Sequence, residues 1–244
     1  MGANAQTAVP VFTAGQVLTA QQQTEINTGI PVFATTVTRD AAFGGAGEKT
    51  LAEGQFAYIE ATNTTQYYDG AAWQTVGITP GLVCVKAETA LSGSSTTADG
   101  VFTSTYTNYR IILRYQTSVQ VAELAMQFRA SAVNTTTNYN YQTLRASSTT
   151  VSAAQATSQS SAFIGQDPGL FTSLTQLEIS GPQLAEPTVY HAINLRNSGA
   201  YTSPQIVQYF GNQSASTAFD GINFLVGTGT MSGTYTIYGY SKTV

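Results

Sequence analysis

The sequence predicts an all-β chain with three parts: an N-terminal arm carrying a short helix, a small β-meander, and a larger antiparallel β-sandwich with jelly-roll character. Short segments in which polar and apolar residues alternate recur from residue 55 onward, and such alternation is typical of half-buried strands. Loops rich in Ser, Thr and Gly separate these segments, as in sandwiches and jelly rolls. Hydrophobic residues make up 42% of the 244 residues, enough for one large domain or two smaller ones.

The arm is expected over residues 1–30. Thr19 is a candidate N-cap for a short helix over residues 19–28, and Gly29 is suited to end it. A helix of this length is not stable alone and must dock on something. The arm is therefore interpreted as a segment that attaches the chain to a neighbouring protein, with a frayed terminus as the alternative.

The small β-meander is expected over residues 31–77. Residues 40–49 are rich in Gly and Ala and are interpreted as a loop. The expected strands are 55–60, 66–68 and 72–76. Asp69-Gly70 is a strong hairpin signal between the last two strands. Trp73, the only tryptophan, is expected to anchor the small core of this sheet rather than to stack on a ligand.

A linker over residues 78–81 leads into the distal β-sandwich, residues 82–244. The expected strands are 83–87, 109–115, 121–129, 139–145, 175–180, 188–196, 204–210, 222–226 and 234–240. Segment 121–129 fits a helix as well as a strand, and a strand is chosen because its neighbours are strands. Residues 146–162 are interpreted as a surface loop and residues 165–169 as a turn.

The low charge of the chain restricts its function. Only 9% of the residues are charged, against about a quarter in an average soluble domain. Low charge favours association, so an oligomer or assembly is expected. The net charge is −4, and the nine Lys and Arg residues do not cluster. Nucleic-acid binding needs a basic stripe to contact phosphates, so nucleic acid is not expected as a partner.

Catalytic and metal sites are not expected. His191, the only histidine, lies in a strand with Val189, Ile193 and Leu195 on the same face, and is interpreted as a core or interface residue. One histidine and one cysteine cannot build a zinc site, and Cys84 is expected to be buried in an apolar run. The sequence has neither a calcium-loop motif nor a nucleophile elbow. No cofactor and no metal are predicted.

Three carboxylates are candidates for the catalytic pair of a glycosidase: Asp167, Glu178 and Glu186. Such enzymes place two carboxylates on opposite sides of one glycosidic bond. Nothing in the spacing of these three residues supports that arrangement, and scattered surface carboxylates are the preferred interpretation. The sequence therefore predicts that the protein is not an enzyme.

The fourteen tyrosines suit recognition of neutral, hydroxyl-rich ligands, because a phenol offers an apolar face and one hydrogen-bonding tip. Tyr139 and Tyr141 lie between polar segments and are expected to be an exposed ligand-binding pair. Tyr201, close to Ser198-Gly199, is a third candidate. The alternative is that most tyrosines pack inside the sheets or between subunits.

The N-terminal part resembles a recurrent module of minor structural and tail-fibre-like proteins of tailed bacteriophages. The segments that carry the resemblance are 12–20, 29–34, 38–42, 51–55 and 68–73, and the last reads Tyr-Asp-Gly-Ala-Ala-Trp. Shorter similarities to distal domains of such proteins occur at 102–109, 219–221 and 237–239. The resemblance implies a virion location, anchoring to other virion proteins through the N-terminal arm, a distal β domain and, commonly, a homotrimer.

Two classes of function remain open. The first is a tail-fibre or receptor-binding subunit that attaches the particle to a host-surface glycan or protein. The second is an architectural capsid fibre, decoration protein or tail adaptor. The start of the chain does not read as a signal peptide, and no apolar run reaches membrane-spanning length. Assembly in the host cytoplasm without membrane insertion is therefore expected.

Overall fold

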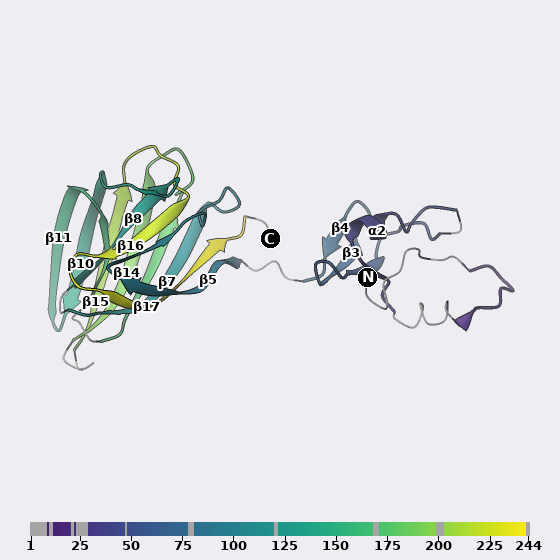
Figure 1. Ribbon diagram of the computed structural model, residues 1–244, viewed down its shortest axis with the longest axis horizontal. Helices are drawn as coiled ribbons and strands as arrows, with labels where there is room; N and C mark the ends of the chain where they lie inside the picture. The colour runs from purple at the N-terminus through teal and green to yellow at the C-terminus, as the bar shows by residue number, and fades with distance from the viewer. Residues whose placement is uncertain are drawn as a thin grey trace. The chain divides into compact units, whose positions relative to one another are not determined.

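The computed structural model describes residues 9, 12–20, 22, 29–46, 48–77, 81–119, 122–167, 171–198 and 203–242. The chain divides into two compact units, Met1–Ile78 and Thr79–Val244, and each is described by itself (Figure 1). The division falls inside the segment assigned to a linker from the sequence.

The first unit contains a four-stranded sheet in the order β1-β2-β3-β4. Its strands are β1 (Val32–Phe33), β2 (Phe56–Ile59), β3 (Thr64–Tyr68) and β4 (Trp73–Thr75). Strands β2, β3 and β4 form the antiparallel meander that the sequence predicts, whereas β1 adds to it in parallel and was not expected. At the β3–β4 turn, the Asp69 carboxylate accepts hydrogen bonds from the backbone N–H groups of Ala71 and Ala72 at 2.9 and 2.7 Å.

The core of this unit is small. Its fully buried residues are Phe33, Ala42, Ala57 and Ile59. Trp73 packs against this cluster, as expected, and the Arg39 guanidinium lies 4.6 Å from the centre of its ring. Arg39 belongs to α2 (Thr36–Asp40), a helix of five residues that the sequence interpretation missed. Thr35 caps α2, because its side chain accepts a hydrogen bond from the Thr38 backbone N–H.

Parts of the predicted arm can be placed. Thr19 Oγ1 accepts from the Gln22 N–H at 3.2 Å, and Gln22 Oε1 accepts from the Thr19 N–H at 3.0 Å, which is the reciprocal pattern of a helix N-terminus. The rest of the predicted 19–28 helix lies outside the described residues, apart from Ala20. Val9 bonds through its backbone to Ala42 and Lys49, so this residue docks on the small unit of its own chain.

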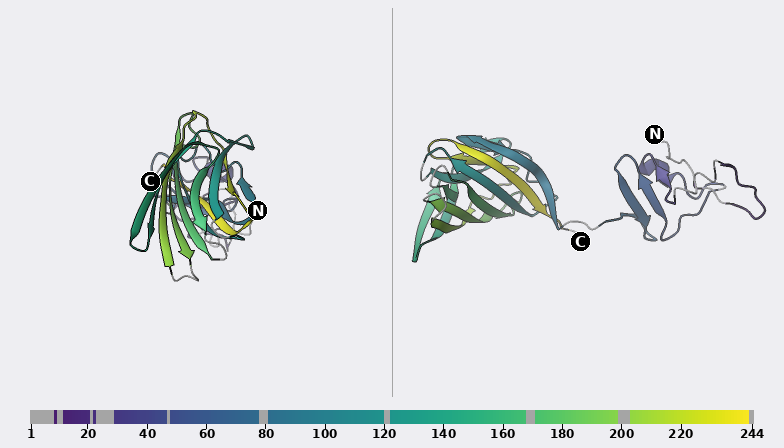
Figure 2. Two further views of the ribbon diagram at one scale, coloured as in Figure 1. Left: turned by 90° about the vertical axis from the view of Figure 1, so that its left-hand side faces the viewer. Right: turned by 90° about the horizontal axis from the view of Figure 1, so that it is seen from below.

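The second unit is an antiparallel β-sandwich, which confirms the predicted all-β fold class (Figures 1 and 2). An eight-stranded sheet, the wide sheet, has the order β11-β10-β15-β14-β13-β7-β17-β5. A five-stranded sheet, the narrow sheet, has the order β12-β8-β16-β6, with β9 paired to β8. The strands are β5 (Leu82–Gly93), β6 (Ser95–Ala98), β7 (Asn108–Thr117), β8 (Ala122–Ala130), β9 (Val133–Asn134), β10 (Tyr139–Ser147), β11 (Thr150–Gln159), β12 (Ala162–Asp167), β13 (Ser173–Ser180), β14 (Thr188–Ser198), β15 (Ser203–Gln213), β16 (Gly221–Val226) and β17 (Met231–Tyr240).

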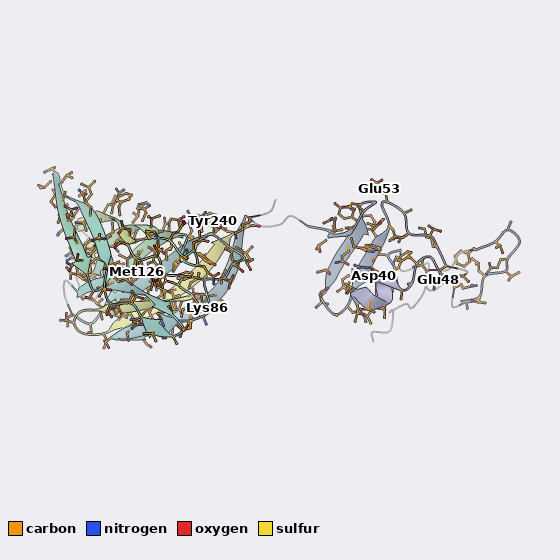
Figure 3. The ribbon with its side chains drawn as sticks, turned by 90° about the horizontal axis from the view of Figure 1, so that it is seen from above. Asp40, Glu48, Glu53, Lys86, Met126 and Tyr240 are labelled. Atoms are coloured by element: carbon orange, nitrogen blue, oxygen red, sulfur yellow. The ribbon has the colours of Figure 1, made fainter. Side chains whose placement is uncertain are left out.

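The core lies between the inner faces of the two sheets. The wide sheet contributes Leu113, Leu177 and Tyr235, all at most 1% exposed. The narrow sheet contributes residues such as Met126 of β8, which is labelled among the packed side chains in Figure 3. Phe128 of the same strand stacks on another ring at a centroid distance of 5.0 Å. Segment 121–129, ambiguous in the sequence, is thus a strand over its described residues because its alternate side chains bury against a second sheet.

Two segments interpreted as irregular are strands. Residues 146–162 contain the end of β10, all of β11 and the start of β12, and the residues from Gly165 to Asp167 belong to β12 rather than to a turn. Residues 168–169 lie outside the described part. Strand β11 is an edge strand whose side chains are exposed on both faces except at Ala156, so its sequence carries no apolar alternation. The apolar alternation that predicts a strand is absent because no core on either face of β11 requires apolar side chains at alternate positions.

Strand β14 has the expected alternation. Val189 and Leu195, assigned with His191 to an apolar face in the core or at an interface, are 51% and 42% exposed on the outer face of the wide sheet. The inner face instead buries polar residues, including Asn194 at 0% exposure. The Asn194 amide donates to Tyr115 and Thr175 and accepts from the Gln166 N–H, so this polar group is satisfied inside the sandwich. Cys84, expected to be buried, is exposed on edge strand β5.

Candidate ligand-binding groove on the outer face of the wide sheet

Four side chains from separate strands form a row across the outer face of the wide sheet. Glu178 of β13 is the register partner of Arg110 of β7 on one side and of His191 of β14 on the other. His191 is in turn paired with Phe210 of β15. Partners on the same face of a sheet lie close enough for their side chains to interact. The fold thus brings together Glu178 and His191, two separate candidates from the sequence, and places Arg110 beside Glu178.

Glu178 is the centre of a polar network. Arg110 Nε donates to Glu178 Oε1 at 2.5 Å, and the Tyr240 hydroxyl lies 3.0 Å from Glu178 Oε2. Figure 3 labels Tyr240, the last residue of β17. The hydrogen bond from Arg110 to Glu178 raises the pKa of Arg110. The side chains of Arg110 and Glu178 are 40% and 33% exposed, so solvent screens this pair and it remains open to a ligand.

His191 presents an aromatic surface beside this network. Its ring stacks on Phe210 at a centroid distance of 4.4 Å and an interplanar angle of 7°. Its Nε2 atom is buried and has no hydrogen-bond partner in the part of the chain that the structure describes. His191 therefore lies at the surface of the sheet, in contact with another ring, and not in the core.

Glu178, His191 and Tyr240 border a groove of about 410 Å³. Its lining residues are Asn108, Glu178, Ile179, Ser180, Val189, Tyr190, His191 and Tyr240. The side chains of Ile179 and Tyr190 belong to the core, so the outward-facing lining is a carboxylate, an amide, two hydroxyls, an imidazole and one aliphatic residue. The volume falls in the range of roughly 300–1,000 Å³ that is usual for ligand sites.

The prediction that Tyr139 and Tyr141 form an exposed pair is wrong. Both point from β10 into the sandwich, at 0% and 8% exposure, because residues 139 and 141 alternate onto the inner face of the strand. The Tyr139 hydroxyl is held in the core: it accepts from the Phe128 N–H at 2.7 Å and donates to the Thr135 carbonyl at 3.1 Å. Tyr141 lines a cavity between the two sheets. Tyr201, the third candidate, lies outside the described residues.

The three candidate carboxylates have separate surroundings. Glu178 interacts with Arg110 and Tyr240, whereas Glu186 is exposed in the segment between β13 and β14. The side chain of Asp167 lies outside the described part. Across the described ranges, no group of three or more His, Cys, Asp or Glu side chains could hold a metal ion.

Comparison with known proteins gives no relative: no family model, no curated protein and no solved structure matches this chain. Among the helices that the structure describes, none is long and apolar enough to cross a membrane.

Proposed function

We propose that this chain is a structural protein of a tailed-bacteriophage particle, and that its sandwich attaches the particle to the host surface as a tail-fibre or receptor-binding subunit. The observation that supports recognition is the groove on the outer face of the wide sheet, where Glu178, His191 and Tyr240 converge. The virion context rests on the resemblance of residues 12–73 to phage structural proteins. The N-terminal part would then bind other virion proteins.

The chemistry of the groove suits a hydroxyl-rich surface ligand. The Glu178 carboxylate accepts hydrogen bonds, the Asn108 amide and Ser180 hydroxyl both donate and accept, and the Val189 side chain offers an apolar contact. A sugar ring has the complementary combination of hydroxyl groups and C–H surface. Because a neutral ligand is held by hydrogen bonds and apolar contact, salt screens the interaction little.

Adsorption of the full-length chain to cells tests this function. Fluorescently labelled protein is incubated with a panel of bacterial strains at low and high ionic strength. Saturable binding to at least one strain, with an affinity that changes less than about threefold between the two salt concentrations, is expected. Strong loss of binding at high salt would indicate a charged receptor and contradict recognition of a neutral ligand.

An architectural role is the second candidate, and the apolar character of the same outer face favours it. Six large apolar side chains on this face are between 42% and 66% exposed: Leu144, Val151, Val189, Leu195, Ile206 and Phe210. Exposed apolar side chains in this number are typical of surfaces that contact another protein. If the folded chain adsorbs to no host strain and labelled protein on the virion is covered by other virion proteins, the architectural role is correct.

A further inference from the structure

A second cavity lies between the two sheets, on the opposite side of the wide sheet from the groove. Its volume is about 310 Å³. Tyr141, Arg145 and Tyr209 line it from the inner face of the wide sheet, and Glu123 and Phe163 line it from the narrow sheet. Since alternate residues of a strand face opposite ways, Tyr209 enters this cavity while its neighbour Phe210 lies on the outer face beside the groove.

The polar groups around this cavity lack partners. The hydroxyls of Tyr141 and Tyr209 and the carboxylate of Glu123 make no hydrogen bond within the described residues. Arg145 Nη2 donates to Gln205 at 2.8 Å, but Arg145 Nε is buried and unpaired there. Tyr141 and Tyr209 are 8% and 4% exposed, and both line a cavity that is partly open to solvent. Buried polar groups are normally hydrogen-bonded, so the buried Arg145 Nε without a partner in the described part of the chain indicates a ligand or water in this space.

Other tyrosines of the same core show what is unusual here. The hydroxyls of Tyr109 and Tyr139 both have protein partners, at 2.9 and 3.1 Å for the bonds that they donate. The hydroxyl of Tyr190 is buried without a partner among the described residues and does not line the cavity, so the lack of a partner is not confined to this site. Tyr141 and Tyr209 differ from Tyr190 because both line the cavity, from β10 and β15.

Charge and shape limit what the cavity can hold. It has one potential negative group, Glu123, and one positive group, Arg145, and these do not form an ion pair within 4.0 Å. Because these two charges are opposite, the net charge of the cavity stays at zero when a neutral ligand binds. The rings of Tyr141, Phe163 and Tyr209 give flat apolar surface, and small side chains such as Ala154 leave room between them. The volume is at the lower end of the range for ligand sites, which restricts the occupant to one small ring.

We propose that this inter-sheet cavity is a second binding site, distinct from the outer groove, and that it takes one uncharged, hydroxyl-rich ring such as a single pyranose. The rings of Tyr141 and Tyr209 contact the C–H face of the sugar. Their hydroxyls, the Glu123 carboxylate and Arg145 Nε bind its hydroxyl groups. Entry is from the exposed rim that Glu123 and Gln155 form.

The test is a calorimetric titration of the full-length chain with D-glucose, D-galactose, D-mannose and N-acetyl-D-glucosamine, each also as its methyl glycoside, and with glycine as a zwitterion. At least one sugar is expected to bind with a millimolar or lower Kd. Binding of the methyl glycoside identifies the terminal residue of a glycan as the natural ligand. Binding of the reducing sugar alone identifies a free monosaccharide.

Tyr141→Phe and Tyr209→Phe remove only the hydroxyls and are each expected to weaken that binding about fivefold, the effect of one hydrogen bond. Tyr106→Phe is the matched control, because Tyr106 lines neither the cavity nor the groove. Since neither cavity hydroxyl has a protein partner, both variants should fold normally. The proposal is overturned if no sugar binds, if glycine binds instead of the sugars, if both cavity variants leave sugar binding unchanged, or if Tyr106→Phe weakens it as much as they do.

Discussion

At the scale of single residues, the tyrosines of the sandwich divide by whether their hydroxyls are paired. Tyr139 has two backbone partners, whereas Tyr209, in the same sheet, has none in the described chain. Both rings are buried to a similar extent, at 0% and 4% exposure. A Tyr-to-Phe change therefore has opposite consequences at the two positions, although the atoms removed are the same.

Tyr139→Phe should destabilise the sandwich by about 1–3 kcal/mol, because it leaves the buried Phe128 N–H without an acceptor. Tyr209→Phe should change the free energy of unfolding by less than about 0.5 kcal/mol or increase it, because it removes a hydroxyl that has no partner. Urea denaturation followed by circular dichroism measures both. Equal losses for the two variants would show that the Tyr209 hydroxyl is paired in solution.

The buried tyrosines also predict a response to alkaline pH. Burial raises the pKa of Tyr141 to about 12, and burial raises the pKa values of Tyr139, Tyr190 and Tyr209 as well. In the unfolded chain a tyrosine ionises near pH 10. Above that pH the unfolded chain loses protons that the folded chain retains, so stability falls as the pH rises. The contribution of these tyrosines to the free energy of unfolding should be constant up to about pH 9 and decrease clearly by pH 11. A flat profile to pH 11 would contradict the burial of these side chains.

At the scale of elements, packing partners decide which strands the sequence reveals. Central strands such as β7, with Ile111 and Leu113 fully buried, show clear alternation and were predicted. Edge strand β11 has no core contact to impose a pattern, and the helix α2, with five residues, is too short for a helical period. Glu178 of the groove and its partner Arg110 are 68 positions apart, and only the register of β7 and β13 joins them. No local pattern contains that register.

The close contact between neighbouring strands leads to a further prediction, which concerns Gly211 of β15. A Cβ on Gly211 of β15 would lie 2.6 Å from the Tyr190 hydroxyl and would also clash with the Asn140 carbonyl oxygen of β10. Backbone atoms paired in a sheet cannot move away easily, so Gly211→Ala should destabilise the sandwich by about 1–3 kcal/mol. Gly227→Ala is the control, because nothing lies within 4 Å of its added Cβ. Thermal unfolding of both variants measures the difference, and equal melting temperatures would refute the packing at β15.

At the scale of the whole molecule, the low charge and the apolar outer face of the wide sheet both favour association with another protein chain. Charged residues are 9% of the chain, and Ile206 and Phe210 on the wide sheet are about half exposed. Composition alone predicts association, whereas the sequence pattern left open whether the apolar face of β14 lies in the core or at an interface. The alternation indicates that Val189, His191 and Leu195 share a face. It does not indicate which face is covered, because the inner face of β14 also carries polar residues such as Asn194, whose amide is hydrogen-bonded there.

The chain is therefore expected to self-associate, and the resemblance to phage fibres sets the expected number at three. Light scattering coupled to size-exclusion chromatography at micromolar concentration should give about three times the 25.7 kDa of one chain. Ile206→Lys and Phe210→Lys, which place charges on the outer face, should shift the equilibrium toward smaller species if that face is the contact. A clean species of 25.7 kDa for the unmodified chain would contradict self-association.

The central claim is recognition of a surface ligand through the groove, and a comparison of two carboxylate variants tests it most directly. Glu178→Gln removes the charge at the centre of the groove, and Glu186→Gln removes an exposed carboxylate that does not line it. Cell adsorption of each full-length variant is measured on a strain that the unmodified chain binds, with melting curves to verify folding. Glu178→Gln is predicted to weaken adsorption at least about tenfold, since hydrogen bonds to charged groups contribute about 1.5–3 kcal/mol, and Glu186→Gln is predicted to leave it unchanged. Equal adsorption of both variants and the unmodified chain, with all three folded, would contradict the account.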